Sequence, residues 1–442
     1  MRDHIGPADA SVSDRRFGFA AAAPLALAYI LLPLAGAFAR HFPVLRLPEW
    51  IPSGWPWLAL AGVGLLAALA AQATRRKPLR PVPLWIGLVL VACGALLALS
   101  LIKLSVPRLQ GPFFPSERFW ILVLPETAPL AFLLLGLAWV LSFGAPARIW
   151  FARFGALLAA LVLADVFYAS LLAGFIVPGG VLLDPGLGER HALLLGLALL
   201  LGVDDPGRAG RFPSGWTLLS MGGFLCCGSP VPLLAVGAAY LFLARTRIEA
   251  RIGFALACAG GVAGPLLGGT PLSMDGRMQV YMTWLAGLES FASHPLALFK
   301  GFGPWPLDLQ LPAQAAVVMG MPDVAFTLPP HAVPSFWMRS ALVWGALPPL
   351  VLLLLSIVLT AVTPGRAMAG IMALALTQGV VYSLLYDGSS GVTLGLAVAC
   401  LLADGVPVLR AAEVAAETVA ATTIKATVPA ERDPARTPPE AD

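Results

Sequence analysis

The chain has 442 residues, of which 58% are hydrophobic and only 12% are charged, and its formal net charge is +4. Soluble domains carry roughly a quarter charged residues, so this composition excludes an ordinary water-soluble fold. Many apolar runs approach the roughly 20 residues that cross a bilayer, which predicts an all-α, polytopic integral membrane bundle of about 12 transmembrane helices. The five cysteines lie in or beside apolar runs without zinc spacing, so we expect packed thiols, no metal and no cofactor.

Residues 1–270 predict a bundle of about nine spans. The first run is longer than a signal-peptide core and lacks a small-residue cleavage site, so we expect it to be retained. Basic clusters near Arg75, Arg148 and Arg247 mark cytoplasmic turns by the positive-inside rule. A glycine and two prolines at 228–232 divide one long run into two short helices. The expected spans are 17–39, 55–73, 83–102, one ending near 143, 155–177, 191–203, two within 216–244, and 252–269.

The C-terminal part, residues 338–408, predicts three closing spans at about 338–362, 367–386 and 390–407. Residues 409–442 are rich in Ala, Thr, Pro and Glu, a composition that buries little surface, so a largely disordered tail is expected. The basic turns place both termini in the cytoplasm. We therefore expect a multi-pass membrane protein in which residues 271–337 form a large loop on the outer face.

Within that loop, Tyr281, Trp284, Leu285, Leu288 and Phe291 fall at helical spacing. This pattern predicts an amphipathic helix on the membrane surface. An arginine, residue 277, precedes the first of these by one turn, which places a cation at the level of the lipid headgroups. A guanidinium can bind a phosphate group through paired hydrogen bonds, so the spacing favours an anion or lipid-diphosphate site. An interfacial anchor is the simpler alternative.

The segment GRMQVYMTWLAGLESFASHPLALFKGFGP resembles the G-R-x-x-x-[WY]…A-L…F…H-P-L-x-G-x-G pattern of the bacterial O-antigen ligase and O-antigen polymerase superfamily. The many spans and the large late outer loop resemble that superfamily too. The resemblance implies a metal-independent glycosyltransferase, which transfers a glycan from undecaprenyl diphosphate to an acceptor sugar on the periplasmic face. The matching residues are Gly276, Arg277, Tyr281, Leu288, Phe291, His294, Pro295, Leu296, Gly301 and Gly303.

The same resemblance implies catalytic roles for Arg277, which would hold the diphosphate, and for His331, which would activate or position the acceptor hydroxyl. A neutral imidazole suits proton acceptance near pH 7. Further residues on or near the outer side are candidates for substrate binding: Arg118, Arg190, Tyr281, Arg339 and Glu126. The implied partners are a lipid-diphosphate-linked glycan donor, a glycan acceptor and membrane lipids, with no nucleic acid.

Two positions depart from the superfamily pattern. Pro230 stands where an arginine is expected after a serine, and Ala332 follows His331 where a small polar residue is expected. A catalytically inactive relative is therefore one alternative. A transporter or flippase is another, because Asp165 lies in mid-span and several helices are interrupted. Location discriminates between them, since a transferase gathers its cations at one outer groove and a transporter places them near mid-membrane. Asp387 is expected to be a turn residue.

Overall fold

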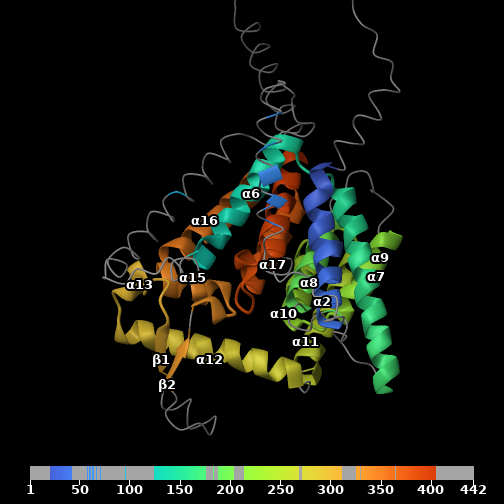
Figure 1. The fold of residues 1–442 in the computed structure, drawn as a ribbon. Coiled ribbons are helices and arrows are strands. Elements are labelled where there is room, and N and C mark those ends of the chain that lie inside the picture. Colours follow the sequence, from blue (N-terminus) through green and yellow to red (C-terminus); the bar gives the residue numbers. More distant parts are fainter. Residues whose placement is uncertain are drawn as a thin grey trace, which may run out of the picture.

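The computed structural model describes residues 20–41, 124–175, 188–203, 214–267, 271–310, 325–328, 330–363 and 365–404, with isolated positions between them. Within these residues the chain is a bundle of α-helices with one small antiparallel ribbon (Figure 1). The expected helical class is confirmed in this sense. The expected spans 55–73 and 83–102 lie almost wholly outside the described residues, as do Arg118 and the tail 409–442.

The N-terminal helices follow the apolar runs closely, and α6 ends at Phe143 as expected. Helix α7 begins seven residues before the expected span at 155, because Arg148 and Arg153 lie inside the helix instead of in a preceding turn. The elements are η1 (Leu27–Leu31), α2 (Leu32–His41), η4 (Leu124–Thr127), α6 (Ala128–Phe143), α7 (Arg148–Ala173), α8 (Gly188–Val203), α9 (Gly215–Cys226), α10 (Pro230–Phe242) and α11 (Arg247–Leu267).

Helix α8 is at the centre of the bundle. It contacts α7, α9, α10 and α17 (Arg366–Gln378), and its leucines are buried around the whole helix. Two neighbouring helices of the bundle also cross closely: a Cβ on Gly237 of α10 would lie 2.6 Å from the backbone nitrogen of Ala257 in α11. Such small-residue contacts let two apolar helices approach closely, which is the packing found where hydrocarbon surrounds the helices.

The C-terminal half is more broken than the apolar runs indicate. The expected single span at 338–362 is wrong, because α15 ends at Trp344, Gly345 adopts a φ of 84°, and α16 begins at Leu347. A short antiparallel pair in the loop was not predicted. The elements are α12 (Pro271–Ser293), α13 (Ala297–Lys300), β1 (Leu307–Gln310), β2 (Ala325–Leu328), η7 (Pro330–Ala332), α15 (Phe336–Trp344), α16 (Leu347–Val362), α17, η8 (Leu384–Tyr386) and an unlabelled helix, Gly388–Asp404.

Helix α12 lies across one end of the bundle, crosswise to α2 and α7 (Figure 1). The apolar residues expected on its membrane face divide into two sets. Tyr281 and Leu288 are each 55% exposed, whereas Trp284 and Phe291 pack against the buried cluster of Val333, Met338 and Leu342. The helix therefore has a large apolar surface on both its inner and its outer side.

Two helices among the described residues are long and apolar enough to cross a membrane: Ala20–Phe38 and Arg148–Ala173. Four shorter helices, of 10 to 17 residues, are also apolar. Large hydrophobic side chains are exposed along α7 and α16, among them Phe167, Leu171 and Leu354. A soluble monomer rarely exposes such contiguous apolar surface.

Candidate functional site

Polar side chains from six elements meet at one end of the bundle. We call them the buried polar cluster. Its members come from η4, α8, the start of α10, α15, the end of α17 and the segment 382–390 that includes η8. They are Glu126, Glu189, Arg190, Ser229, Arg339, Gln378, Tyr382, Tyr386, Asp387 and Ser390. The adjacent residues Tyr386 and Asp387 connect the two ion pairs at its centre.

The first ion pair joins Arg339 of α15 to Glu126 of η4. Arg339 Nη2 donates to Glu126 Oε1 at 2.7 Å, and Nε donates to Oε1 and Oε2 at 3.2 and 3.1 Å. The two side chains are only 6% and 1% exposed. The guanidinium carbon also lies 3.7 Å from the centroid of the Tyr386 ring. Paired hydrogen bonds and an aromatic face hold this cation in one orientation.

The second ion pair joins Arg190, in the first turn of α8, to Asp387, which precedes the last helix. Arg190 Nη2 donates to Asp387 Oδ1. The other carboxylate oxygen, Oδ2, accepts from the backbone N–H of Ser390 at 2.9 Å and so caps the helix Gly388–Asp404. An aspartate is stable at this place because it satisfies a free N–H and faces the positive end of the helix dipole. Asp387 is therefore more than the expected turn residue.

Glu189 links this pair to the break between α9 and α10. Its Oε2 accepts from Ser229 Oγ and from Gln378 Nε2, both at 2.6 Å. Ser229 is the N-cap residue of α10, and Pro230 is its first residue, where the missing N–H costs nothing. The expected break at 228–232 is thus confirmed. At this break Ser229 therefore donates to the carboxylate of Glu189, and Pro230 begins α10.

A glycine-to-glycine junction holds α12 and α13 against α15. Phe302 N donates to Leu342 O at 2.6 Å, and Gly303 N donates to Val343 O at 3.1 Å. Gly301 and Gly345 have φ values of 72° and 84°, and a Cβ on Gly301 would overlap the Val343 carbonyl oxygen. Glycine is required at both positions because each combines a positive φ with a close backbone contact.

The end of α17 is joined to both α12 and α15. Trp284 Nε1 of α12 donates to Val380 O at 3.0 Å. Ser335 Oγ donates to Gly379 O at 3.1 Å, and Phe336 N donates to Tyr382 O at 3.1 Å. These bonds satisfy carbonyl groups that a helix leaves free at its C-terminus. They also place α12 at the end of the bundle that carries the buried polar cluster.

The sequence-predicted residues have different outcomes. The structure brings together Arg190, Arg339 and Glu126, while Tyr281 lies on α12 with its side chain exposed. Arg277 lies in α12 and His331 in η7, but their side chains lie outside the described part of the chain. Arg118 lies wholly outside it. The proposed convergence of Arg277 with His331 therefore stays a prediction.

Several cluster members were not singled out from the sequence: Glu189, Gln378, Tyr382 and Tyr386. The partners of Glu189, Gln378 and Tyr386 lie far away in the chain, so no local pattern signals these residues. Tyr382 contacts Ser390, eight positions further on. Asp387 carries one available signal, since an aspartate followed by Gly-Ser-Ser before an apolar run is a helix N-cap pattern. Asp165, the transporter candidate, is buried and accepts from the backbone N–H of Leu183 at 2.8 Å.

Both arginines of the cluster are paired with carboxylates, Arg190 with Asp387 and Arg339 with Glu126. The third carboxylate, of Glu189, accepts hydrogen bonds from Ser229 and Gln378. An incoming diphosphate would therefore require cations from elsewhere, and α12 carries Arg277 at this end. No group of three or more His, Cys, Asp and Glu side chains suited to a metal ion lies among the residues that the structure describes.

The chain matches no protein-family model, and no curated protein matches it. The resemblance to O-antigen ligases and polymerases therefore depends on the residues of α12 and α13 and on the arrangement around them.

Proposed function

We propose that this protein is a multi-pass protein of the bacterial inner membrane, with about 12 spans, cytoplasmic termini and an active face outside. The composition supports this proposal, because 58% of the residues are hydrophobic. The exposed apolar faces of α7 and α16 support it as well, since hydrocarbon is the solvent that such faces require. The Glu126–Arg339 pair is buried and the Arg190–Asp387 pair is partly buried, in keeping with the rule that charged groups of membrane proteins face the bundle interior and pair with one another.

We further propose that it transfers a glycan from undecaprenyl diphosphate to an acceptor sugar, as an O-antigen or exopolysaccharide polymerase or ligase. The observation that carries this proposal is the arrangement of α12. The helix bears the superfamily-like segment, lies across one end of the bundle, and is attached there through the Gly301–Gly345 junction (Figure 1). Its arginine would meet the phosphate groups of a lipid at that surface.

In the proposed reaction, the acceptor hydroxyl attacks the anomeric carbon of the donor glycan. The bond from that carbon to the diphosphate oxygen breaks, and undecaprenyl diphosphate leaves. Arg277 stabilises the charge that grows on the leaving group. His331 accepts the proton of the hydroxyl. Tyr281 and Arg118 are proposed contacts for the glycan and the diphosphate, while the paired Arg190, Arg339 and Glu126 form the polar wall beside them.

A transporter or flippase is the second candidate, and one observation favours it. Carboxylates neutralise both described arginines of the cluster, so neither arginine is available to a diphosphate. Paired charges of this kind suit a network whose partners exchange during transport. A catalytically inactive relative remains the third candidate because Pro230 starts α10 where an arginine is expected.

Variants of Arg277 and His331 test the proposal. Purified protein in nanodiscs is given a lipid-diphosphate glycan and an acceptor glycan, and product is measured. Arg277→Ala should lower the rate by about a hundred- to a thousand-fold, and His331→Ala by at least about a hundred-fold. Arg251→Ala, at an exposed arginine of α11, is the matched control and should transfer normally. Full activity of both site variants would reject the proposed site.

A further inference from the structure

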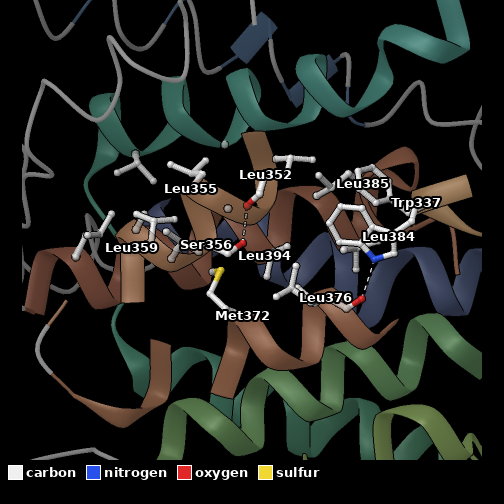
Figure 2. Close-up of a pocket in the computed structure, with 18 residues that line it drawn as sticks. Trp337, Leu352, Leu355, Ser356, Leu359, Met372, Leu376, Leu384, Leu385 and Leu394 are labelled. Atoms are coloured by element: carbon white, nitrogen blue, oxygen red, sulfur yellow. Dashed lines mark hydrogen bonds between the residues drawn. The ribbon is translucent and has the colours of Figure 1, made fainter. Parts of the chain in front are cut away.

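A cavity of about 130 Å³ lies between α16 and the neighbouring helices (Figure 2). Its walls come from α6, α15, α16, α17, η8 and the helix Gly388–Asp404, and most of its side chains are aliphatic. Its polar side-chain groups are already bonded: Ser356 Oγ donates to Leu352 O at 2.7 Å, and Trp337 Nε1 donates to Leu376 O at 2.8 Å. The cavity therefore offers an occupant contacts suited to hydrocarbon.

Helix α16 separates this cavity from the outer surface of the bundle. Leu352, Leu355 and Leu359 line the cavity, while Leu354 and Ile357 are exposed on the other side of the helix. The helix contains no charged residue, and the cavity is partly open. In the proposed membrane placement the exposed apolar side chains of α16 face lipid tails. An aliphatic chain that passes α16 meets no charged group of that helix.

No charged residue lines the cavity among the residues that the structure describes. Phe336 lines the cavity, and its ring centroid lies 5.7 Å from that of Tyr386. Tyr386 in turn contacts the guanidinium of Arg339, which Glu126 neutralises. Within the described residues, the cavity thus offers no unpaired cation to a diphosphate headgroup. Its chemistry fits a hydrocarbon chain whose headgroup makes no specific contact.

Glycine creates part of this space. Gly395 lines the cavity, and a Cβ built on it would have no heavy atom within 4 Å. Because bilayer tails are as apolar as leucine, transfer from water does not drive a chain into this site. The driving force is the set of van der Waals contacts that an occupant makes with the lining side chains.

We propose that this cavity binds one acyl chain of a bilayer phospholipid, at a site separate from that of the lipid diphosphate. The inference depends on the membrane placement under the proposed function, but not on glycosyl transfer. A phospholipid is the occupant because the described lining selects for a chain and not for an anionic headgroup. The bilayer also supplies such chains in large excess.

Native mass spectrometry of the full chain tests the site, with dioleoyl phosphatidylethanolamine added to delipidated protein as the probe. The wild type should retain one phospholipid, and Gly395→Leu, which fills the space, should retain at least about ten-fold less. Gly261→Leu is the control, because Gly261 is a helical glycine with equally open surroundings on the outer side of α11. Retention of an isoprenoid diphosphate in place of the phospholipid, or equal retention by Gly395→Leu, would overturn the proposal.

A second variant covers the possibility that Gly395→Leu does not fold. Ser356→Phe fills the cavity from α16, and its thermal midpoint should no longer rise when phospholipid is added, as that of the wild type should. A midpoint that still rises by the wild-type amount would count against the site. Transfer is assayed on the same samples. Lipid retention without transfer contradicts only the proposed reaction, and transfer without retention contradicts only the cavity site.

Discussion

The Glu126–Arg339 pair gives the sharpest stability prediction. The variant Glu126→Gln removes the negative charge and leaves a guanidinium that is only 6% exposed without its carboxylate. Breaking a buried pair from one side costs about 3–5 kcal/mol. The Tyr386 ring stays at 3.7 Å from the guanidinium carbon and continues to stabilise the cation. We therefore expect a loss near the lower end of that range, about 3 kcal/mol.

The assay is the free energy of unfolding in mixed micelles, titrated with a denaturing detergent and followed by circular dichroism. Glu289→Gln, at an exposed glutamate of α12, is the matched control and should change stability by less than about 0.5 kcal/mol. Replacing both partners, as Glu126→Met with Arg339→Met, should cost less than either single change because no unpaired charge remains. Equal losses for Glu126→Gln and Glu289→Gln would refute the reasoning, as would additive losses in the double variant.

Two further predictions concern the junction and the cytoplasmic side. Gly301→Ala should destabilise the protein by at least about 2 kcal/mol, because the new Cβ would overlap the Val343 carbonyl at a position whose φ is 72°. Gly261→Ala, at an open helical position, should be neutral or stabilising. Thermal unfolding measures both changes. Glu249 lies in the expected cytoplasmic turn. Burial raises its pKa, but hydrogen bonds from Arg366 and from the Arg245 and Thr246 amides outweigh burial and lower it below 4.5. Its stabilisation is thus present above pH 4.5 and is lost as the pH falls below that value, so the unfolding midpoint should fall on acidification and Glu249→Gln should flatten that dependence. An unchanged acid response in Glu249→Gln would contradict this assignment.

Local sequence patterns predicted the helices best where composition changes abruptly. The helix break at 228–232 and the end of α6 at Phe143 coincide with Gly-Ser-Pro and Gly-Ala-Pro segments, in which the glycine has a positive φ and the proline has no N–H. The start of α7 was missed because basic residues normally mark turns. Arg148 remains in the helix because its Nε donates to Asp404 Oδ2 at 2.6 Å, a partner 256 positions away.

The buried polar cluster depends on contacts that no local pattern contains. The break at Gly345 has a local signal that was overlooked, because Pro348 and Pro349 lie in the first turn of α16. The contact of Gly345 with the 299–301 backbone accompanies its left-handed φ. The sequence did single out Glu126, Arg190 and Arg339 as candidate site residues. It did not reveal that carboxylates neutralise both arginines, because these partners are separated by 213 and 197 positions.

The central claim is tested most directly by following a lipid-diphosphate glycan labelled in both its sugar and its lipid, in vesicles that contain only the wild-type protein and an acceptor glycan. Glycosyl transfer predicts that the sugar label moves to the acceptor while the lipid label appears as undecaprenyl diphosphate, in equal amounts and with a metal chelator present. Movement of the intact donor across the bilayer, with both labels still joined, would contradict the account and identify a transporter.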